Sequence, residues 1–278
     1  MISFDFDREY FDATATLECG QIFRFRPYKD GYIVFSTDKA CYVRSEGHKT
    51  VVECEDEEYF RNFFDLSEDY SEICRFAMNC GHEIVRLAAD KARGIRILRQ
   101  DEEEMFYSFI VSQNNMIPRI KGIIERTSAA IGEKRDFCGE EYFSFPKTAA
   151  FSKCDEDFFK GLGYGYRSAY MTACSAAIES GEVDLKKLGE ADTATLKKSL
   201  ISMKGVGPKV ADCIALFGYH RTDSFPVDTW IEKLYREDFG GTLKDRKKIS
   251  EYFTGEFGTY GGYVQQYIFY YKRSLAAK

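Results

Sequence analysis

The segment that most restricts how this chain can fold is a glycine-rich break between two stretches with helical periodicity. It reads Leu200-Ile201-Ser202-Met203-Lys204-Gly205-Val206-Gly207-Pro208-Lys209-Val210-Ala211-Asp212-Cys213. A helix over Ala194–Met203 should end here, because Gly205 and Gly207 allow a tight reversal with positive backbone angles. Pro208 suits the first turn of the next helix, where its missing N–H costs nothing. The segment therefore predicts a helix–hairpin–helix at about residues 196–218.

The same glycines predict a phosphate site. They expose backbone amides at a helix N-terminus, and such amides bind phosphate groups. Together with the neighbouring Lys204, we interpret Gly205 and Gly207 as phosphate contacts. The alternative is an ordinary glycine corner between two helices, and Gly-Val-Gly taken alone does not exclude it.

Lys209 is a candidate nucleophile. It falls in the first turn of a helix predicted over Pro208–Tyr219, where the positive end of the helix dipole disfavours a cation. Partial burial would lower the pKa of the amine further and free it for nucleophilic attack. The alternative is a solvent-facing lysine that contacts a phosphate, and position alone favours that alternative.

Asp228 is a candidate partner for this amine. It lies in Phe225-Pro226-Val227-Asp228-Thr229-Trp230, directly before a helix predicted over Thr229–Asp238. That position is typical of a helix N-cap. A carboxylate can also stabilise positive charge on a sugar as its leaving group departs, or assist proton transfer. Both roles are compatible in one residue.

The segment Met203–Cys213, followed by Pro226-Val227-Asp228, resembles the helix–hairpin–helix DNA glycosylase superfamily and, most closely, its 8-oxoguanine DNA glycosylase branch. The resemblance implies that a base is flipped out of duplex DNA. It also implies that the Lys209 amine attacks the anomeric carbon of the deoxyribose that carries this base. A Schiff base and β-elimination of the strand would follow, with Asp228 as the carboxylate partner. The phosphates at the hairpin would then be those of DNA.

Two further segments resemble the parts of this family that fill the gap left by a flipped base. In Gln113-Asn114-Asn115-Met116-Ile117-Pro118-Arg119, the resemblance implies that Asn114 and Arg119 contact the estranged cytosine. In Gly163-Tyr164-Gly165-Tyr166-Arg167, it implies that Tyr166 is a wedge and that Arg167 reaches the same cytosine. The alternatives are a polar loop and a flexible glycine loop. Because Met116 stands where a further asparagine is expected, we expect a looser preference for cytosine.

The remaining matches concern the damaged base. Gly20 resembles the glycine whose carbonyl accepts the hydrogen on N7 of 8-oxoguanine, a hydrogen that guanine lacks. Gln265 and Phe269 are four residues apart and share a helix face. The resemblance implies that Gln265 binds the polar edge of the base, while Phe269 and Cys213 lie against its two faces. The alternatives are a strand turn at Gly20 and a core position for Phe269.

The predicted fold class is α+β, with a small N-terminal domain (residues 1–95) packed on a larger all-α domain (96–278). Short segments rich in β-branched and aromatic residues predict an antiparallel sheet with turns between them. These segments are Ala15–Cys19, Gln21–Arg26, Tyr32–Ser36, Ala40–Arg44 and Thr50–Cys54. Amphipathic helices are predicted over Glu57–Leu66 and Tyr70–Met78, where they would cover one face of the sheet.

Helical periodicity dominates from about residue 96 onward. Besides the helices given above, the pattern predicts Glu102–Asn114, Ile117–Ile131, Asp155–Phe159, Tyr166–Ser180, Lys247–Phe257 and Tyr260–Ser274.

Composition narrows the class of protein. The chain has 278 residues and a net charge of −6, but its acid is concentrated before residue 105, so a locally basic face remains compatible with DNA. The nine cysteines form no Cys-x-x-Cys pair and no histidine lies at metal-ligand spacing from another. We therefore expect no zinc or iron–sulfur site, and the family implies no organic cofactor. No apolar run or leader suggests a membrane, so we expect an intracellular protein, in the cytoplasm or nucleoid of a prokaryote or the nucleus of a eukaryote.

The sequence thus predicts a monomeric bifunctional glycosylase and abasic-site (AP) lyase whose partner is duplex DNA containing 8-oxoguanine. One rival is a superfamily member that excises alkylated bases, for which a lysine nucleophile is not required. Another is an endonuclease III-like enzyme, which usually has a four-cysteine iron–sulfur motif near its C-terminus, whereas no cysteine follows Cys213. A third is a DNA-binding protein that uses the hairpin only for nonspecific phosphate contact and cleaves nothing.

Overall fold

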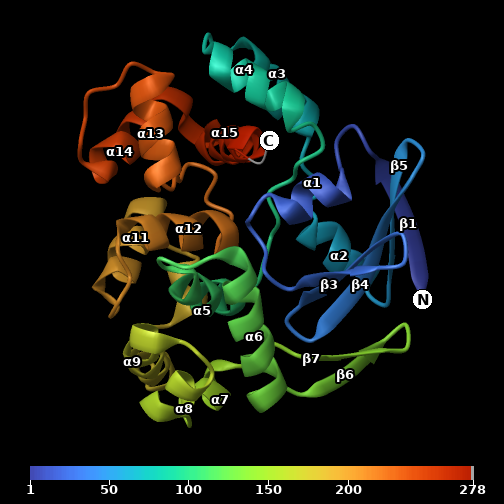
Figure 1. The fold of residues 1–278 in the computed structure, drawn as a ribbon, viewed down its shortest axis with the longest axis vertical. Coiled ribbons are helices and arrows are strands. Elements are labelled where there is room, and N and C mark those ends of the chain that lie inside the picture. The colour runs from blue at the N-terminus through green and yellow to red at the C-terminus, as the bar shows by residue number, and fades with distance from the viewer. Residues whose placement is uncertain (277–278) are drawn as a thin grey trace.

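A five-stranded antiparallel sheet and a larger body of helices make up the computed structural model, which describes residues 1–276 (Figure 1). The sheet has the strand order β1-β5-β4-β3-β2. Its strands are β1 (Ile2–Asp7), β2 (Phe25–Tyr28), β3 (Gly31–Ser36), β4 (Lys39–Glu46) and β5 (Lys49–Cys54). The predicted α+β fold class is confirmed.

The sheet is buried on both faces. Cys41 and Val43 of β4 belong to a core cluster shared with the aromatic side chains of α2 (Glu57–Phe63). Ala40 and Tyr42, which alternate with them, point to the opposite face. There they meet a β-hairpin formed by β6 (Lys134–Phe137) and β7 (Glu140–Phe143), far along the chain. The helical part of the chain therefore reaches back over the sheet.

The first predicted strand is wrong. Ala15–Cys19 lies largely in a helix, α1 (Ala13–Glu18), because Asp12 caps it by accepting a hydrogen bond from the Ala15 amide. The apolar residues Ala13, Ala15 and Leu17 are buried by packing that local propensity does not reveal. The segment Gln21–Arg26 becomes a strand only from Phe25. Strand β1 was not predicted, although Ile2, Phe4 and Phe6 alternate with polar residues as a half-buried strand requires.

The predicted helices are present, with ends shifted by a few residues. The helices of the first half and centre are α3 (Tyr70–Asn79), α4 (Glu83–Lys91), α5 (Glu102–Ser112), α6 (Ile117–Ile131), α7 (Thr148–Phe151) and α8 (Glu156–Gly161). Those that follow are η1 (Gly165–Arg167), α9 (Ser168–Glu179), α10 (Leu185–Leu188), α11 (Thr193–Ser202), α12 (Pro208–Gly218), α13 (Thr229–Glu237), α14 (Arg246–Phe257), η2 (Gly258–Tyr260) and α15 (Gly261–Ala276). The sequence did not predict α4, α7, α10 or the β6–β7 hairpin.

The predicted division at residue 95 does not follow the cores. Residues of α3 and α4 belong to the same large cluster as α12 and α15, and α15 packs against α4 (Figure 1). A buried ion pair between Arg24 and Glu104 also joins the sheet to α5, with 3.4 Å between Nη1 and Oε2. The domain boundary stays a prediction. Within residues 1–276, no helix is both long enough and apolar enough to cross a membrane.

Candidate active site

One small cavity brings together residues from five distant parts of the chain. It has a volume of about 60 Å³ and is lined by Gly20, Phe109, Lys209, Cys213, Phe217, Pro226, Asp228, Gln265, Gln266 and Phe269. Both predicted catalytic residues and all four predicted base-binding residues are in this set. A cavity of this size holds only a few water molecules, so a flipped base requires side chains to move apart.

Gly20 lines this cavity opposite α15, which contributes Gln265, Gln266 and Phe269. Its φ is +91°, which favours glycine, and a Cβ placed there would lie 3.4 Å from Cε1 of Phe269. The close approach allows the backbone of Gly20 and the ring of Phe269 to border the same space. Both predicted contacts therefore face one cavity from different elements.

The pKa of Lys209 shifts in the opposite direction to the one predicted from the sequence. The side chain is half-buried in the first turn of α12, with Nζ 5.9 Å from the centre of the Phe109 ring. The neighbouring Cys213, and then Asp228, raise the pKa of this amine, and together they outweigh the burial that lowers it. The expectation of a lowered pKa is wrong, because it considered burial without the neighbouring Cys213 and Asp228.

Asp228 is an N-cap, as predicted. Its Oδ1 accepts hydrogen bonds from the amides of Trp230 and Ile231 at 2.9 Å each. The cap fixes the carboxylate at the start of α13, beside the cavity that Lys209 also lines. Oδ2 takes no part in the cap, so capping and a role in the cavity are geometrically compatible.

The cavity contains a buried polar atom that has no hydrogen-bond partner among the described residues. Gln265 is 6% exposed, and its Oε1 has no hydrogen-bond partner among the described residues. A buried amide oxygen without a partner is costly, so its presence in a cavity indicates a site for a donor. Cys213, on the neighbouring helix, is buried as well, and burial raises the pKa of its thiol.

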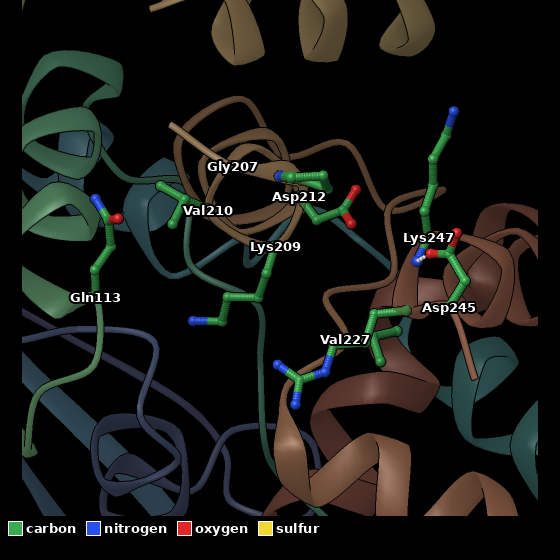
Figure 2. A pocket seen from close by; sticks show the side chains of 10 residues that line it. Gln113, Gly207, Lys209, Val210, Asp212, Val227, Asp245 and Lys247 are labelled. Carbon is green, nitrogen blue, oxygen red and sulfur yellow. Dashed lines mark hydrogen bonds between the residues drawn. The ribbon is translucent and has the colours of Figure 1, made fainter. Parts of the chain in front are cut away.

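Lys209 also lines a second cavity, of about 300 Å³ (Figure 2). It is lined by Gln113, the start of α12, Val227 and the start of α14. Figure 2 shows the Lys209 side chain extending toward the side that Gln113 lines, while the Asp212 carboxylate points elsewhere. Arg246 and Lys247 add positive charge to this cavity, and neither was predicted to be a site residue. The sequence signal for these two residues was a capping aspartate among basic residues, in the run Lys244-Asp245-Arg246-Lys247-Lys248.

At the hairpin, the two glycines differ. Gly205 has φ +83°, as predicted, and a Cβ there would lie 2.3 Å from the Tyr170 ring. Gly207 has φ −90° and ψ 174°, so the expected positive angle is wrong at this position. Gly207 instead serves as the N-cap residue of α12 and has open space around it. Lys204 is exposed next to them.

Comparisons with known proteins identify the family of this chain. The family described as 8-oxoguanine DNA glycosylase, N-terminal domain, matches residues 3–106. A crystal structure of Clostridium acetobutylicum 8-oxoguanine glycosylase/lyase, in complex with duplex DNA containing cytosine opposite 8-oxoguanine, is 34% identical. It superposes with a TM-score of 0.91 over 96% of this chain and 93% of that chain. The chain belongs to the 8-oxoguanine DNA glycosylase family.

Curated relatives support the assignment over shorter stretches. An Arabidopsis thaliana N-glycosylase/DNA lyase is 33% identical over 64% of this chain, and a probable N-glycosylase/DNA lyase of Methanothermobacter thermautotrophicus is 29% identical over 76%. These matches span 52% of the Arabidopsis protein and 72% of the archaeal one. The chain therefore covers about half the length of the plant relative.

In this member of the 8-oxoguanine DNA glycosylase family, the predicted opposite-base residues lie in the turn after α5, in the first turn of α6 and in η1, which hydrogen bonds connect. Asn114 is exposed with φ +44°, and Tyr166 is 53% exposed. Arg119 donates a hydrogen bond to the carbonyl of Gly163 at 3.2 Å. The roles of these residues toward an opposite base, and the looser cytosine preference, stay predictions.

Arg167 is placed differently from its neighbours. It is only 3% exposed, whereas contact with a base needs an accessible side chain. Its guanidinium donates hydrogen bonds to the carbonyls of Gln113 and Asn114 and so fastens η1 to the loop after α5. Arg167 thus holds the loop that carries Asn114.

Proposed function

We propose that this protein is a bifunctional DNA glycosylase and AP lyase that removes 8-oxoguanine from duplex DNA. The observation that carries the proposal is the single cavity lined by Lys209, Asp228, Gly20, Cys213, Gln265 and Phe269. A purely DNA-binding protein gives no reason for an amine, a carboxylate and the four predicted base contacts to share one cavity.

The proposed reaction begins with extrusion of the nucleotide, which costs a few kcal/mol that phosphate and wedge contacts offset. Phe269 and Cys213 lie against the faces of the base, Gln265 binds its polar edge, and the carbonyl of Gly20 accepts the hydrogen on N7. The unpartnered Oε1 of Gln265 supports this assignment, because a base edge supplies the missing donor.

The Lys209 amine then forms a bond to the anomeric carbon as the bond from that carbon to the base breaks. Since its pKa is raised, the amine must first lose a proton. Asp228 is the carboxylate available to the cavity, where it stabilises the positive charge that develops on the sugar. Opening of the sugar ring gives a Schiff base, and loss of a proton from C2′ expels the 3′ phosphate.

Borohydride reduction tests this function directly. Duplex DNA with a single 8-oxoguanine is incubated with the protein and borohydride, and covalent adduct is measured by gel electrophoresis. We expect an adduct with the wild type and none with Lys209→Gln. Lys198→Gln, which changes an exposed lysine on α11 that lines neither cavity, is the matched control and should retain the adduct.

The rival functions give other results. A wild type that forms no adduct and cleaves no duplex containing an oxidised purine would exclude the proposed function. Binding that weakens steeply with salt, without strand cleavage, would indicate the nonspecific DNA-binding protein. Adducts with oxidised pyrimidines but not with 8-oxoguanine would favour an endonuclease III-like activity.

A further inference from the structure

Gln266 ties the last helix to the turn that precedes the active-site glycine. Its side chain is 2% exposed, and its Nε2 donates a hydrogen bond of 2.8 Å to the carbonyl of Cys19. The two residues are 247 positions apart in the chain. Gln266 also lines the cavity, directly after Gln265 on α15. One helix therefore carries a base contact and the clamp on the opposite wall.

The clamped peptide group adjoins Gly20. Because the carbonyl of Cys19 belongs to the peptide bond that leads into Gly20, fixing that carbonyl also fixes the amide of Gly20. Gly20 has a left-handed φ, and a Cβ on it would lie 3.2 Å from Nη1 of Arg273 and 3.4 Å from Cε1 of Phe269, so side chains of α15 border its backbone closely. The orientation of the Gly20 carbonyl is thus set partly from α15.

The far side of Gly20 is held by a different set of bonds. The Gln21 side chain donates to the carbonyl of Arg96 at 2.7 Å and accepts from the amide of Leu98 at 2.9 Å. Gln100 donates to the carbonyl of Gln21 at 3.0 Å. These bonds anchor Gln21 to the segment between α4 and α5. Of the two anchors, the one at Gln266 connects Gly20 to the helix that carries Gln265 and Phe269.

We propose that Gln266 is a positioning residue that sets the discrimination between 8-oxoguanine and guanine by holding the Gly20 carbonyl in register with Gln265 and Phe269. This inference rests on the proposed function. A carbonyl oxygen favours the N7 hydrogen of 8-oxoguanine and repels the N7 lone pair of guanine only while it stays in place. A carbonyl that can yield loses the bond and also relieves the repulsion, since both depend steeply on geometry.

Gln266→Met tests the role, because methionine keeps the length of the side chain but has no donor. We expect the preference for 8-oxoguanine over guanine to fall about tenfold, in line with one lost buried hydrogen bond. The preference is measured as the ratio of Kd values for the two duplexes in a Lys209→Gln background, in which no chemistry occurs. Gln266→Glu replaces the donor by an acceptor that faces the Cys19 carbonyl. It should lower the ratio of Kd values at least as far as Gln266→Met does.

A second readout separates positioning from general damage. Cleavage of a duplex that already contains an abasic site involves no base, so in Gln266→Met with Lys209 intact the preference for 8-oxoguanine should fall several-fold further than the rate of abasic-site cleavage. Ser274→Ala removes a side-chain hydrogen bond to the Tyr271 carbonyl on the same helix, outside the cavity, and should keep the wild-type ratio.

Two outcomes would overturn the inference. One is an unchanged ratio in folded Gln266→Met, and the other is a parallel loss of abasic-site cleavage, which would show a merely structural role. Failure of the proposed function itself looks different, because the wild type would then form no borohydride adduct and would show no preference for 8-oxoguanine.

Discussion

Lys209 combines two demands that oppose each other. A nucleophilic amine must be neutral, yet Cys213 and Asp228 raise its pKa in the DNA-free structure. The negative charge of Asp228 becomes useful once the amine is part of a cationic Schiff base, because the carboxylate stabilises that cation. The arrangement therefore favours the charged intermediate more than the free nucleophile.

This balance predicts a pH dependence. Because the raised pKa lies above the ordinary lysine value, the neutral fraction of Lys209 should rise about tenfold per pH unit across the neutral range. The rate of cleavage of a preformed abasic duplex in single turnover should rise with pH accordingly. Asp228→Asn keeps a capping side chain but removes the charge, which lowers the pKa of Lys209. The rise of its cleavage rate with pH should therefore occur at lower pH than in the wild type. A wild-type rate that is flat from pH 6 to 9 would contradict this account.

At the scale of elements, the hairpin is held by contacts that reach beyond its own sequence. Lys197 of α11 forms an ion pair with Asp212 of α12, and Ser250 of α14 donates to Oδ2 of Asp212 at 3.4 Å. Burial raises the pKa of Asp212, although Lys197 opposes this rise. The three helices around Lys209 are thereby joined at one carboxylate.

The turn of the hairpin yields a matched pair of variants. Gly205→Ala would force a left-handed alanine against the Tyr170 ring, so we expect the free energy of unfolding to fall by about 2–4 kcal/mol. Gly207→Ala meets no atom within 4 Å at an ordinary φ and should change stability by less than about 1 kcal/mol. Urea denaturation measures both, and equal losses in the two variants would refute the distinction.

At the scale of the whole molecule, Asp65 joins the two parts of the chain. It is fully buried just after α2, with Oδ1 2.6 Å from Nε of Arg99 and Oδ2 3.4 Å from Nε2 of His220, which follows α12. Tyr70 also donates a hydrogen bond to its Oδ2 at 3.1 Å. Burial raises the pKa of Asp65, but His220 and Arg99 outweigh it and hold the pKa below its ordinary value. The helix that carries Lys209 is thus fastened to the N-terminal part.

Asp65→Asn should lower the free energy of unfolding by about 2–4 kcal/mol at pH 7, because the buried Arg99 ion pair loses its counter-charge and the contact with His220 is weakened. A lowered pKa in the folded state gives stability that is present above the unfolded pKa and is lost on acidification. The difference between wild type and variant should therefore shrink as the pH falls below about 4. Urea titrations at several pH values measure this.

The control for Asp65 is Asp90→Asn, which changes an exposed acid beside Arg93 and should have little effect at any pH. A difference for Asp65→Asn that grows on acidification would contradict the sign of the shift.

The sequence by itself determined the elements whose cause is local. The hairpin follows from its glycines and Pro208, the start of α13 from Asp228, and the shared face of Gln265 and Phe269 from helical spacing. The tertiary structure decided features that depend on distant atoms. Burial of apolar residues favoured a helix over most of Ala15–Cys19. Cys213 and Asp228 reversed the expected pKa shift of Lys209, and Arg167 turned inward to the Gln113 carbonyl. The Gln266 clamp belongs to this second class, because no local pattern connects α15 to Cys19.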